Sequence, residues 1–152
     1  MRQVLKKFFS MIKIRHVGIV TKNLKKSLYF WCDLLNFEIK KNILENGDLI
    51  DKVLGYKNVK VQTIKLQDGF GNLIEILYFY NPPKTKNLKK FPYSLGYTHI
   101  SITVKNIQKI YKKLIKNKIK FNSKPTKSSD GKVIMTYCAT PENGYLELVE
   151  EI

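Results

Sequence analysis

The sequence contains an internal repeat in which two segments, offset by 83 residues, carry matching residues in the same order. The first segment runs His16-Val-Gly-Ile-Val-Thr-Lys-Asn23, and the second runs His99-Ile-Ser-Ile-Thr-Val-Lys-Asn106. Histidine, lysine and asparagine coincide, and apolar positions are largely preserved. A chain of 152 residues has the length of one ordinary domain. The repeat therefore predicts a single domain built from two similar modules.

Each repeat is expected to begin as a strand and to continue into a helix. Asn23 and Asn106 are natural N-caps, because an asparagine side chain accepts hydrogen bonds from the first free backbone amides of a helix. Apolar residues then recur at helical spacing within 24–35 and within 107–115. The two halves are therefore predicted to share one strand–helix opening.

Three strand-like runs are expected after each helix. Asn36 and Asn117 are expected to end the helices in the left-handed conformation. The runs lie near 37–44, 59–66 and 73–80 in the first half, and near 119–122, 132–138 and 145–151 in the second. The chain is thus predicted to be α+β, in the order βαβββ, linker, βαβββ. The predicted boundaries are an N-terminal arm at 1–11, a first module at 12–81, a linker at 82–95 and a second module at 96–152.

The net charge is +16, from 28 basic and 12 acidic residues. Only Arg2 and Arg15 are arginines, and the lysines are spread along the chain without one dominant block. Proteins that read nucleic acids usually contact bases through arginine and cluster their charge on one element. We therefore expect no nucleic-acid partner, and we expect the positive field to favour a small anionic ligand.

The chain carries no signal for a membrane or for secretion. No apolar run approaches the roughly 18 residues needed to cross a bilayer. Lys6 and Lys7 interrupt the N-terminal segment where a secretory signal would place its apolar stretch. Cys32 and Cys138 follow no metal-ligand spacing and are expected to be reduced thiols. These features predict a cytoplasmic protein with no membrane partner.

Two histidines and two glutamates occupy matching positions in the two halves. His16 and His99 open the first strands, and they are the only histidines in the chain. Glu75 lies between two isoleucines and Glu147 between two leucines, each in a closing strand. An ionised carboxylate inside an apolar strand costs several kcal/mol unless a partner or a metal compensates it. Any one such residue is usually an ordinary core or solvent-facing residue, but their repetition favours a site.

The recurrence of these residues predicts that two imidazoles and two carboxylates converge on a divalent cation. The predicted ligands are His16, Glu75, His99 and Glu147, with one ion per site. This set suits Zn²⁺, Ni²⁺, Co²⁺, Mn²⁺ or Fe²⁺ and does not choose among them. Neither cysteine is in register with the pattern, so no thiolate ligand is expected.

The order of these motifs resembles that of the vicinal oxygen chelate (VOC) superfamily over about residues 12–151. The matching motifs are Ile14-Arg-His16-Val-Gly-Ile-Val, Ser27-Leu-Tyr-Phe-Trp-Cys-Asp-Leu-Leu-Asn-Phe37 and Leu-Glu147-Leu. The superfamily includes glyoxalase I, methylmalonyl-CoA epimerase, fosfomycin-resistance transferases, bleomycin-binding proteins and extradiol dioxygenases. The resemblance implies the glyoxalase fold, in which two paired βαβββ modules form a curved mixed sheet shaped like a cup. It also implies that the first and last strands of both modules supply the metal ligands.

Among these groups, the chain is most similar to glyoxalase I and the epimerases, which use a metal with four protein ligands to stabilise an enediolate or enolate. This similarity implies a lyase or isomerase of the lactoylglutathione lyase type, with Glu147 or Glu75 as general base. Glutathione-dependent members carry an arginine and an asparagine where this chain has Val20 and Phe79, which puts glutathione dependence in doubt. Extradiol dioxygenases take two histidines from the second module, which here has only His99, so that class is disfavoured.

Two alternatives to a glyoxalase I-like enzyme stay open. One is a metal-free small-ligand-binding protein of the resistance type, and the other is a methylmalonyl-CoA epimerase-like enzyme. The substrate is expected to be a small anionic or carbonyl-containing molecule, and family analogy suggests a homodimer. The insertion at 45–55 is expected to be a surface turn and short helix, or part of the rim of the cup.

Overall fold

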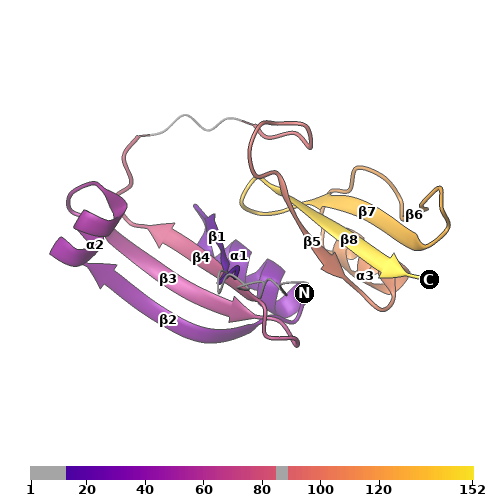
Figure 1. Ribbon diagram of the computed structural model, residues 1–152, viewed down its shortest axis with the longest axis horizontal. Helices are drawn as coiled ribbons and strands as arrows, with labels where there is room; N and C mark the ends of the chain where they lie inside the picture. The colour runs from indigo at the N-terminus through magenta and orange to yellow at the C-terminus, as the bar shows by residue number, and fades with distance from the viewer. Residues whose placement is uncertain (1–12, 85–88) are drawn as a thin grey trace, which may run out of the picture.

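Two four-stranded sheets, one from each half of the chain, form the framework of the protein in the computed structural model (Figure 1). The structure describes residues 13–84 and 89–152. The predicted N-terminal arm at 1–11 and part of the predicted linker lie outside the described residues. Among the described residues, no helix combines the length and the apolar character needed to span a membrane.

The first module has the sheet order β1-β4-β3-β2, with β1 parallel to β4 and the other pairs antiparallel. The insertion forms a turn and a short helix, α2, as expected. The elements are β1 (Val17–Val20), α1 (Leu24–Leu28), the π-helical segment η1 (Tyr29–Leu34), β2 (Glu38–Asn46), α2 (Asp48–Leu54), β3 (Lys60–Gln67) and β4 (Leu73–Phe79).

The second module repeats this arrangement with the sheet order β5-β8-β7-β6, in which β5 is parallel to β8. The α+β class and the two βαβββ modules are therefore confirmed, and both sheets are mixed. The elements are β5 (His99–Thr103), α3 (Ile107–Lys116), β6 (Thr126–Lys127), β7 (Val133–Ala139) and β8 (Tyr145–Glu151).

Asparagine side chains cap the helices α1 and α3 at their N-termini. Asn23 accepts a hydrogen bond from the backbone N–H of Lys26 at 3.0 Å, and Asn106 accepts one from the N–H of Lys109 at 2.8 Å. These contacts satisfy amides that have no partner within the helix. Both N-cap predictions are confirmed.

The helical segment of the first module, α1 with η1, and the helix α3 of the second module end differently. Asn36 has a φ of 62° and is left-handed as predicted, but Asn117 has a φ of −92°. In the second module Lys118 adopts the left-handed conformation instead, with a φ of 62°. The side-chain amide of Asn117 donates to the carbonyl of Lys113, so this residue still belongs to the last helical turn. The prediction for Asn117 was wrong by one residue.

The strand predicted near 119–122 is absent. Phe121 makes only an isolated bridge with Cys138, and the chain then bends before β6 pairs with β7 through two residues. Pro125 follows this bend, directly before β6, and has no N–H to donate to a ladder. The edge strand of the second sheet is therefore β6, which is shorter and later in the chain than predicted.

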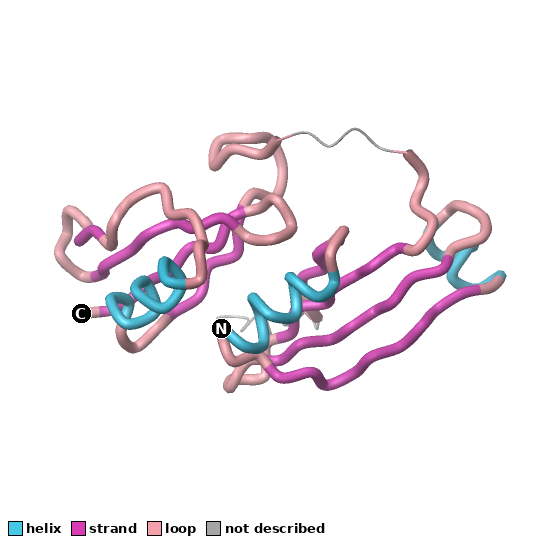
Figure 2. The backbone as a smooth tube through the Cα atoms, turned by 180° about the vertical axis from the view of Figure 1, so that it is seen from behind, coloured by secondary structure: helices cyan, strands magenta, loops and turns pink. Residues whose placement is uncertain are grey.

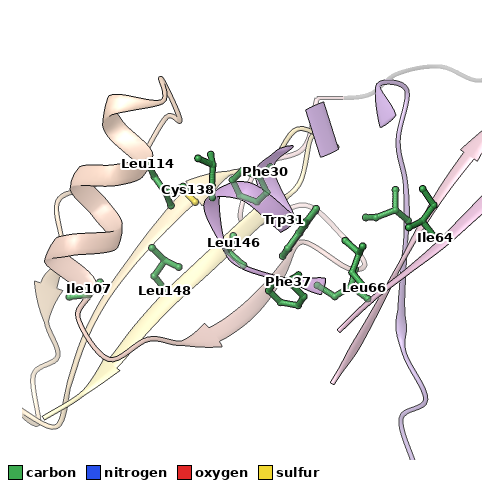
Figure 3. Close-up of a cluster of buried hydrophobic side chains, with 13 residues drawn as sticks. Phe30, Trp31, Phe37, Ile64, Leu66, Ile107, Leu114, Cys138, Leu146 and Leu148 are labelled. Carbon is green, nitrogen blue, oxygen red and sulfur yellow. The ribbon is translucent and has the colours of Figure 1, made fainter. Parts of the chain in front are cut away.

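The helices cover one face of each sheet and leave the other face, here called the open face, without helical cover. Figure 2 shows α1 and α3 on the same side of the molecule, each over its own sheet. One cluster of buried apolar side chains joins the two modules (Figure 3). It includes Phe30, Trp31 and Phe37 from the first module and Leu114, Leu146 and Leu148 from the second. Each such side chain stabilises the fold by roughly 1.5–3 kcal/mol relative to an exposed one.

Polar contacts add to the packing between the modules. The ammonium group of Lys113 in α3 donates to the backbone carbonyls of Asp33 at 3.1 Å and Leu34 at 2.7 Å. The indole N–H of Trp31 donates to Glu142 Oε1 at 3.3 Å. The helix side of the molecule is thus the side on which the modules are joined.

Candidate metal centre

The first predicted pair, His16 and Glu75, comes together on the open face of the first sheet. Pairing of β1 with β4 places Gly18 opposite Glu75, and His16 lies just before the start of β1. The distance from His16 Nε2 to Glu75 Oε2 is 3.2 Å, and the two side chains are 27% and 13% exposed. Because Ile74 and Ile76 point into the core, strand alternation directs Glu75 to the opposite face. The same alternation is visible in the sequence, where Glu75 lies between two isoleucines.

The second pair, His99 and Glu147, occupies the same position on the second sheet. Ser101 lies opposite Glu147 in the pairing of β5 with β8. His99 Nε2 is 3.9 Å from Glu147 Oε2, and the side chains are 39% and 16% exposed. Thr98 Oγ1 lies 3.0 Å from His99 Nδ1 and thereby orients the ring with its Nε2 toward the carboxylate.

The two carboxylates have different neighbours on the adjacent strand. Lys65 of β3 faces Glu75 in register, with 3.6 Å between Nζ and Oε1. Tyr137 of β7 faces Glu147 in the same way, and its ring meets that of His99 edge-on at a centroid distance of 5.2 Å. Burial, a hydrogen bond from its hydroxyl to Glu147 and the charge of that carboxylate raise the pKa of Tyr137 above its usual value. Tyr137 is therefore a neutral donor at physiological pH.

Sequence reasoning did not single out Lys65, although a signal was present. Lys65 interrupts the apolar pair Ile64 and Leu66, both buried, just as Glu75 interrupts two isoleucines. Its position opposite Glu75 depends on the register between β3 and β4. That register depends on the geometry of the turn that joins the two strands, which was not predicted from the sequence.

The four predicted ligands form two pairs rather than one cluster. Among the described residues of one chain, no group of three or more His, Cys, Asp and Glu side chains is arranged to hold a metal ion. Each pair nevertheless offers one imidazole nitrogen and one carboxylate, which divalent transition metals prefer. His16 Nδ1 is buried and has no hydrogen-bond partner among the described residues, so this ring has a nitrogen that the protein itself leaves without a partner. The donor atoms therefore suit a metal ion, with each histidine–glutamate pair forming one half of a four-ligand site.

A cavity of about 500 Å³ lies between the modules, next to β1, the start of β5 and the turn between β7 and β8. Among the predicted ligands, only His99 lines it. Trp31 and Glu142 also line it, and Glu142 Oε2 is buried without a hydrogen-bond partner among the described residues. This cavity is therefore distinct from the two open faces that carry the carboxylates Glu75 and Glu147.

The two cysteines are separate from both pairs, and we expect them to react slowly with alkylating reagents. Burial raises the pKa of the Cys138 thiol to about 12, and burial with the nearby charge of Asp33 raises the pKa of Cys32. At pH 8 only about one Cys138 in ten thousand would be a thiolate, the reactive form. Iodoacetamide labelling at pH 8, read by mass spectrometry, should thus be at least about 100-fold slower at Cys138 in the folded protein than in denaturant. Equal rates in the two states would contradict the burial of this thiol.

Comparison with known proteins gives a family and a fold. The sequence matches the family described as Glyoxalase/Bleomycin resistance protein/Dioxygenase superfamily over residues 13–148. No curated protein sequence gives a significant match. A glyoxalase family protein from Bacillus cereus superposes with a TM-score of 0.86 at 20% identity, and the match covers 96% of this chain and 98% of that chain.

Two further solved structures share the fold at lower similarity. The trypanothione-dependent glyoxalase I of Leishmania major has a TM-score of 0.64 and 18% identity, covering 92% of this chain and 87% of that chain. The fosfomycin resistance protein FosX of Listeria monocytogenes, solved with Mn(II) and sulfate, has a TM-score of 0.63 and 14% identity, covering 94% and 95%. At these identities the likeness shows the fold alone.

Proposed function

Because the chain belongs to the glyoxalase/bleomycin resistance protein/dioxygenase superfamily, we propose that it is a divalent-metal-dependent lyase or isomerase of the glyoxalase I type. The proposed reaction moves a proton at a carbon next to a carbonyl group. The observation that carries the proposal is the recurrence of one histidine–glutamate pair at the same sheet position in both modules, 3.2 Å apart in one and 3.9 Å in the other.

The proposed metal ligands are His16 and Glu75 from one module and His99 and Glu147 from the other. Since the pairs lie on separate sheets, we propose a homodimer in which the first module of one copy faces the second module of its partner. The edge strand β1 is a candidate contact surface between the two copies, because its apolar residues Val17 and Val20 are 42% and 56% exposed. Both sites of such a dimer are equivalent by symmetry.

When bound, the ion would polarise the substrate oxygens and stabilise the negative charge that develops on them. The protein residues then have separate tasks. The carboxylate of Glu147 takes the proton from carbon and returns it at the product position, so that the proton is conserved and no redox partner is needed. Tyr137 holds that carboxylate by a hydrogen bond, and the edge-on ring contact keeps His99 beside it. Glu75 and His16 supply the opposite pair of ligands.

Elemental analysis of purified protein that has never met a chelator tests the metal requirement. We expect about one equivalent of a divalent transition metal per chain, because each dimer would hold two four-ligand sites. The Glu75→Ala variant should lose the metal. The Glu45→Ala variant should keep it, because Glu45 accepts a hydrogen bond from Thr63 Oγ1 on the same sheet and belongs to neither pair. Wild-type protein that contains no metal and takes up none would contradict the proposal and leave the metal-free ligand-binding alternative.

A further inference from the structure

Two lysines face each other across neighbouring strands on the open face of the first sheet. Lys41 of β2 pairs with Lys65 of β3, and Lys65 pairs in turn with Glu75 of β4. These three residues therefore form one row that ends at the candidate metal pair. Like charges directly opposite each other in a sheet are destabilising. The pairing of Lys41 with Lys65 is therefore unfavourable for the fold, and a negative group bound beside the two lysines would offset this cost.

The burial of Lys65 is unusual in this chain. Among the described lysines, only Lys65 and Lys113 are partly buried, and all the others are exposed. The burial of Lys113 has a structural explanation, since its ammonium group donates to two backbone carbonyls and links the modules. The side chain of Lys65 is 24% exposed, and its nearest recorded partner is Glu75 Oε1 at 3.6 Å.

An ammonium group has three hydrogens to donate, and a partly desolvated one gains from charged acceptors. Lys65 donates no hydrogen bond within 3.5 Å to another described residue, so its donors remain available to a ligand. The corresponding position in the second module is held by Tyr137, a neutral residue. The basic row is thus a property of the first module rather than of the repeat.

We propose that Lys65 and Lys41 bind an anionic oxygen group, a carboxylate or a phosphate, of the molecule on which the neighbouring metal pair acts. This inference rests on the proposed function for the identity of the site, and it narrows the substrate class to anions. Glu75 and Glu45 face the same side of the sheet and repel an anion. Glu45, however, accepts a hydrogen bond from Thr63, and the charge of Glu75 is partly offset by the ammonium group of Lys65 at 3.6 Å. Because Lys41 adds a second positive charge, the row of Lys41, Lys65 and Glu75 carries a net positive charge that attracts an anion.

The test is an NMR titration of the full-length protein with inorganic phosphate and, separately, with sodium acetate. The metal is removed with EDTA, the EDTA is then removed by gel filtration into metal-free buffer because it is itself a carboxylate, and about 0.15 M NaCl screens the general field of the surface. We expect saturable shifts of the backbone amides of Lys65 and Glu75 with at least one of the two anions. The tighter anion identifies whether the group is a phosphate or a carboxylate.

Variants separate a specific contact from the overall charge. Lys65→Met should weaken anion binding about tenfold or more, since a hydrogen bond to a charged group contributes roughly 1.5–3 kcal/mol. Lys65→Arg should restore most of the affinity, and Lys41→Met should weaken it as well. The control is Lys60→Met, which removes the same charge from the same strand but lies on the opposite face, where Lys60 contacts the ring of Tyr80. It should change the affinity by less than about twofold.

Equal weakening by Lys65→Met and Lys60→Met, or the absence of saturable shifts with both anions, would overturn the inference. Metal content, measured on the same preparations without EDTA, tests the proposed function separately. Saturable anion binding in a protein that takes up no metal would overturn the proposed function alone. A stoichiometric metal without anion binding at the row would overturn this inference alone.

Discussion

Mixing the His16→Ala and His99→Ala variants, each unable to hold metal alone, should restore about a quarter of the wild-type metal content. In the proposed dimer, each site takes His16 and Glu75 from one copy and His99 and Glu147 from the other. After random exchange of subunits, half of the dimers contain one copy of each variant, and each of these has one intact site and one site lacking both histidines. Each variant alone leaves every site without one ligand.

The measurement is the metal that stays with the protein after gel filtration in metal-free buffer. Removing a residue that hydrogen-bonds to a metal ligand typically lowers the metal affinity 10–100-fold, and removing the ligand itself should lower it further. A mixture of His16→Ala with Glu75→Ala is the matched control, because both changes lie in the first module and no combination of these copies rebuilds a site. Mass spectrometry of the dimers verifies that subunits have exchanged. Exchange without recovery of metal would show that the ligands of one site come from one chain.

Replacing Glu147 with glutamine should slow proton transfer by roughly 10²–10⁴-fold and leave the fold and the metal stoichiometry intact. Glutamine keeps the size of the side chain and one oxygen that can face a metal, but it cannot accept a proton at physiological pH. General acid–base catalysis contributes roughly 10²–10⁴-fold to a rate, and the expected loss lies in this range. The measurement is the loss of the α-proton signal in ¹H NMR when carbonyl compounds are incubated with the protein in D₂O.

The matched comparison is Tyr137→Phe. This variant removes only the hydrogen bond to Glu147 and should lower the exchange rate by a smaller factor, because the carboxylate remains. Metal content and amide spectra show whether each variant is folded and loaded. An unchanged rate in the Glu147→Gln variant would remove this residue from the mechanism and leave Glu75 as the candidate base.

The most accurate sequence predictions concern features that depend on local chemistry. Asn23 and Asn106 were identified as N-caps because capping involves only the next three residues of the chain. The strand at 119–122 was predicted wrongly because apolar residues near Phe121 indicate burial but not the length of a ladder. The bend at 122–124, followed by Pro125, limits this ladder to a single bridge and moves the edge pairing to β6.

The histidine–glutamate pairs could be predicted for a different reason. A strand has a period of two, so a carboxylate between two core residues must face away from the helix. The parallel pairing of the first and last strands of each module then brings the histidine next to it. The repeat supplied the same evidence twice, which is why the four residues could be selected as one set, although their arrangement as two pairs was not predicted.

The sequence pattern was sufficient to predict the two modules, their helix starts, and the strands that carry the histidines and glutamates. The folded structure was needed to show that the four residues lie as two pairs on separate sheets, and that Lys65 and Tyr137 give the two carboxylates different surroundings. The physical reason is that strand alternation is a local property of the backbone. Register between strands depends on turn geometry and on which face is buried. The placement of one sheet relative to the other depends on contacts between residues far apart in the chain, such as Trp31 with Glu142 and Lys113 with Leu34.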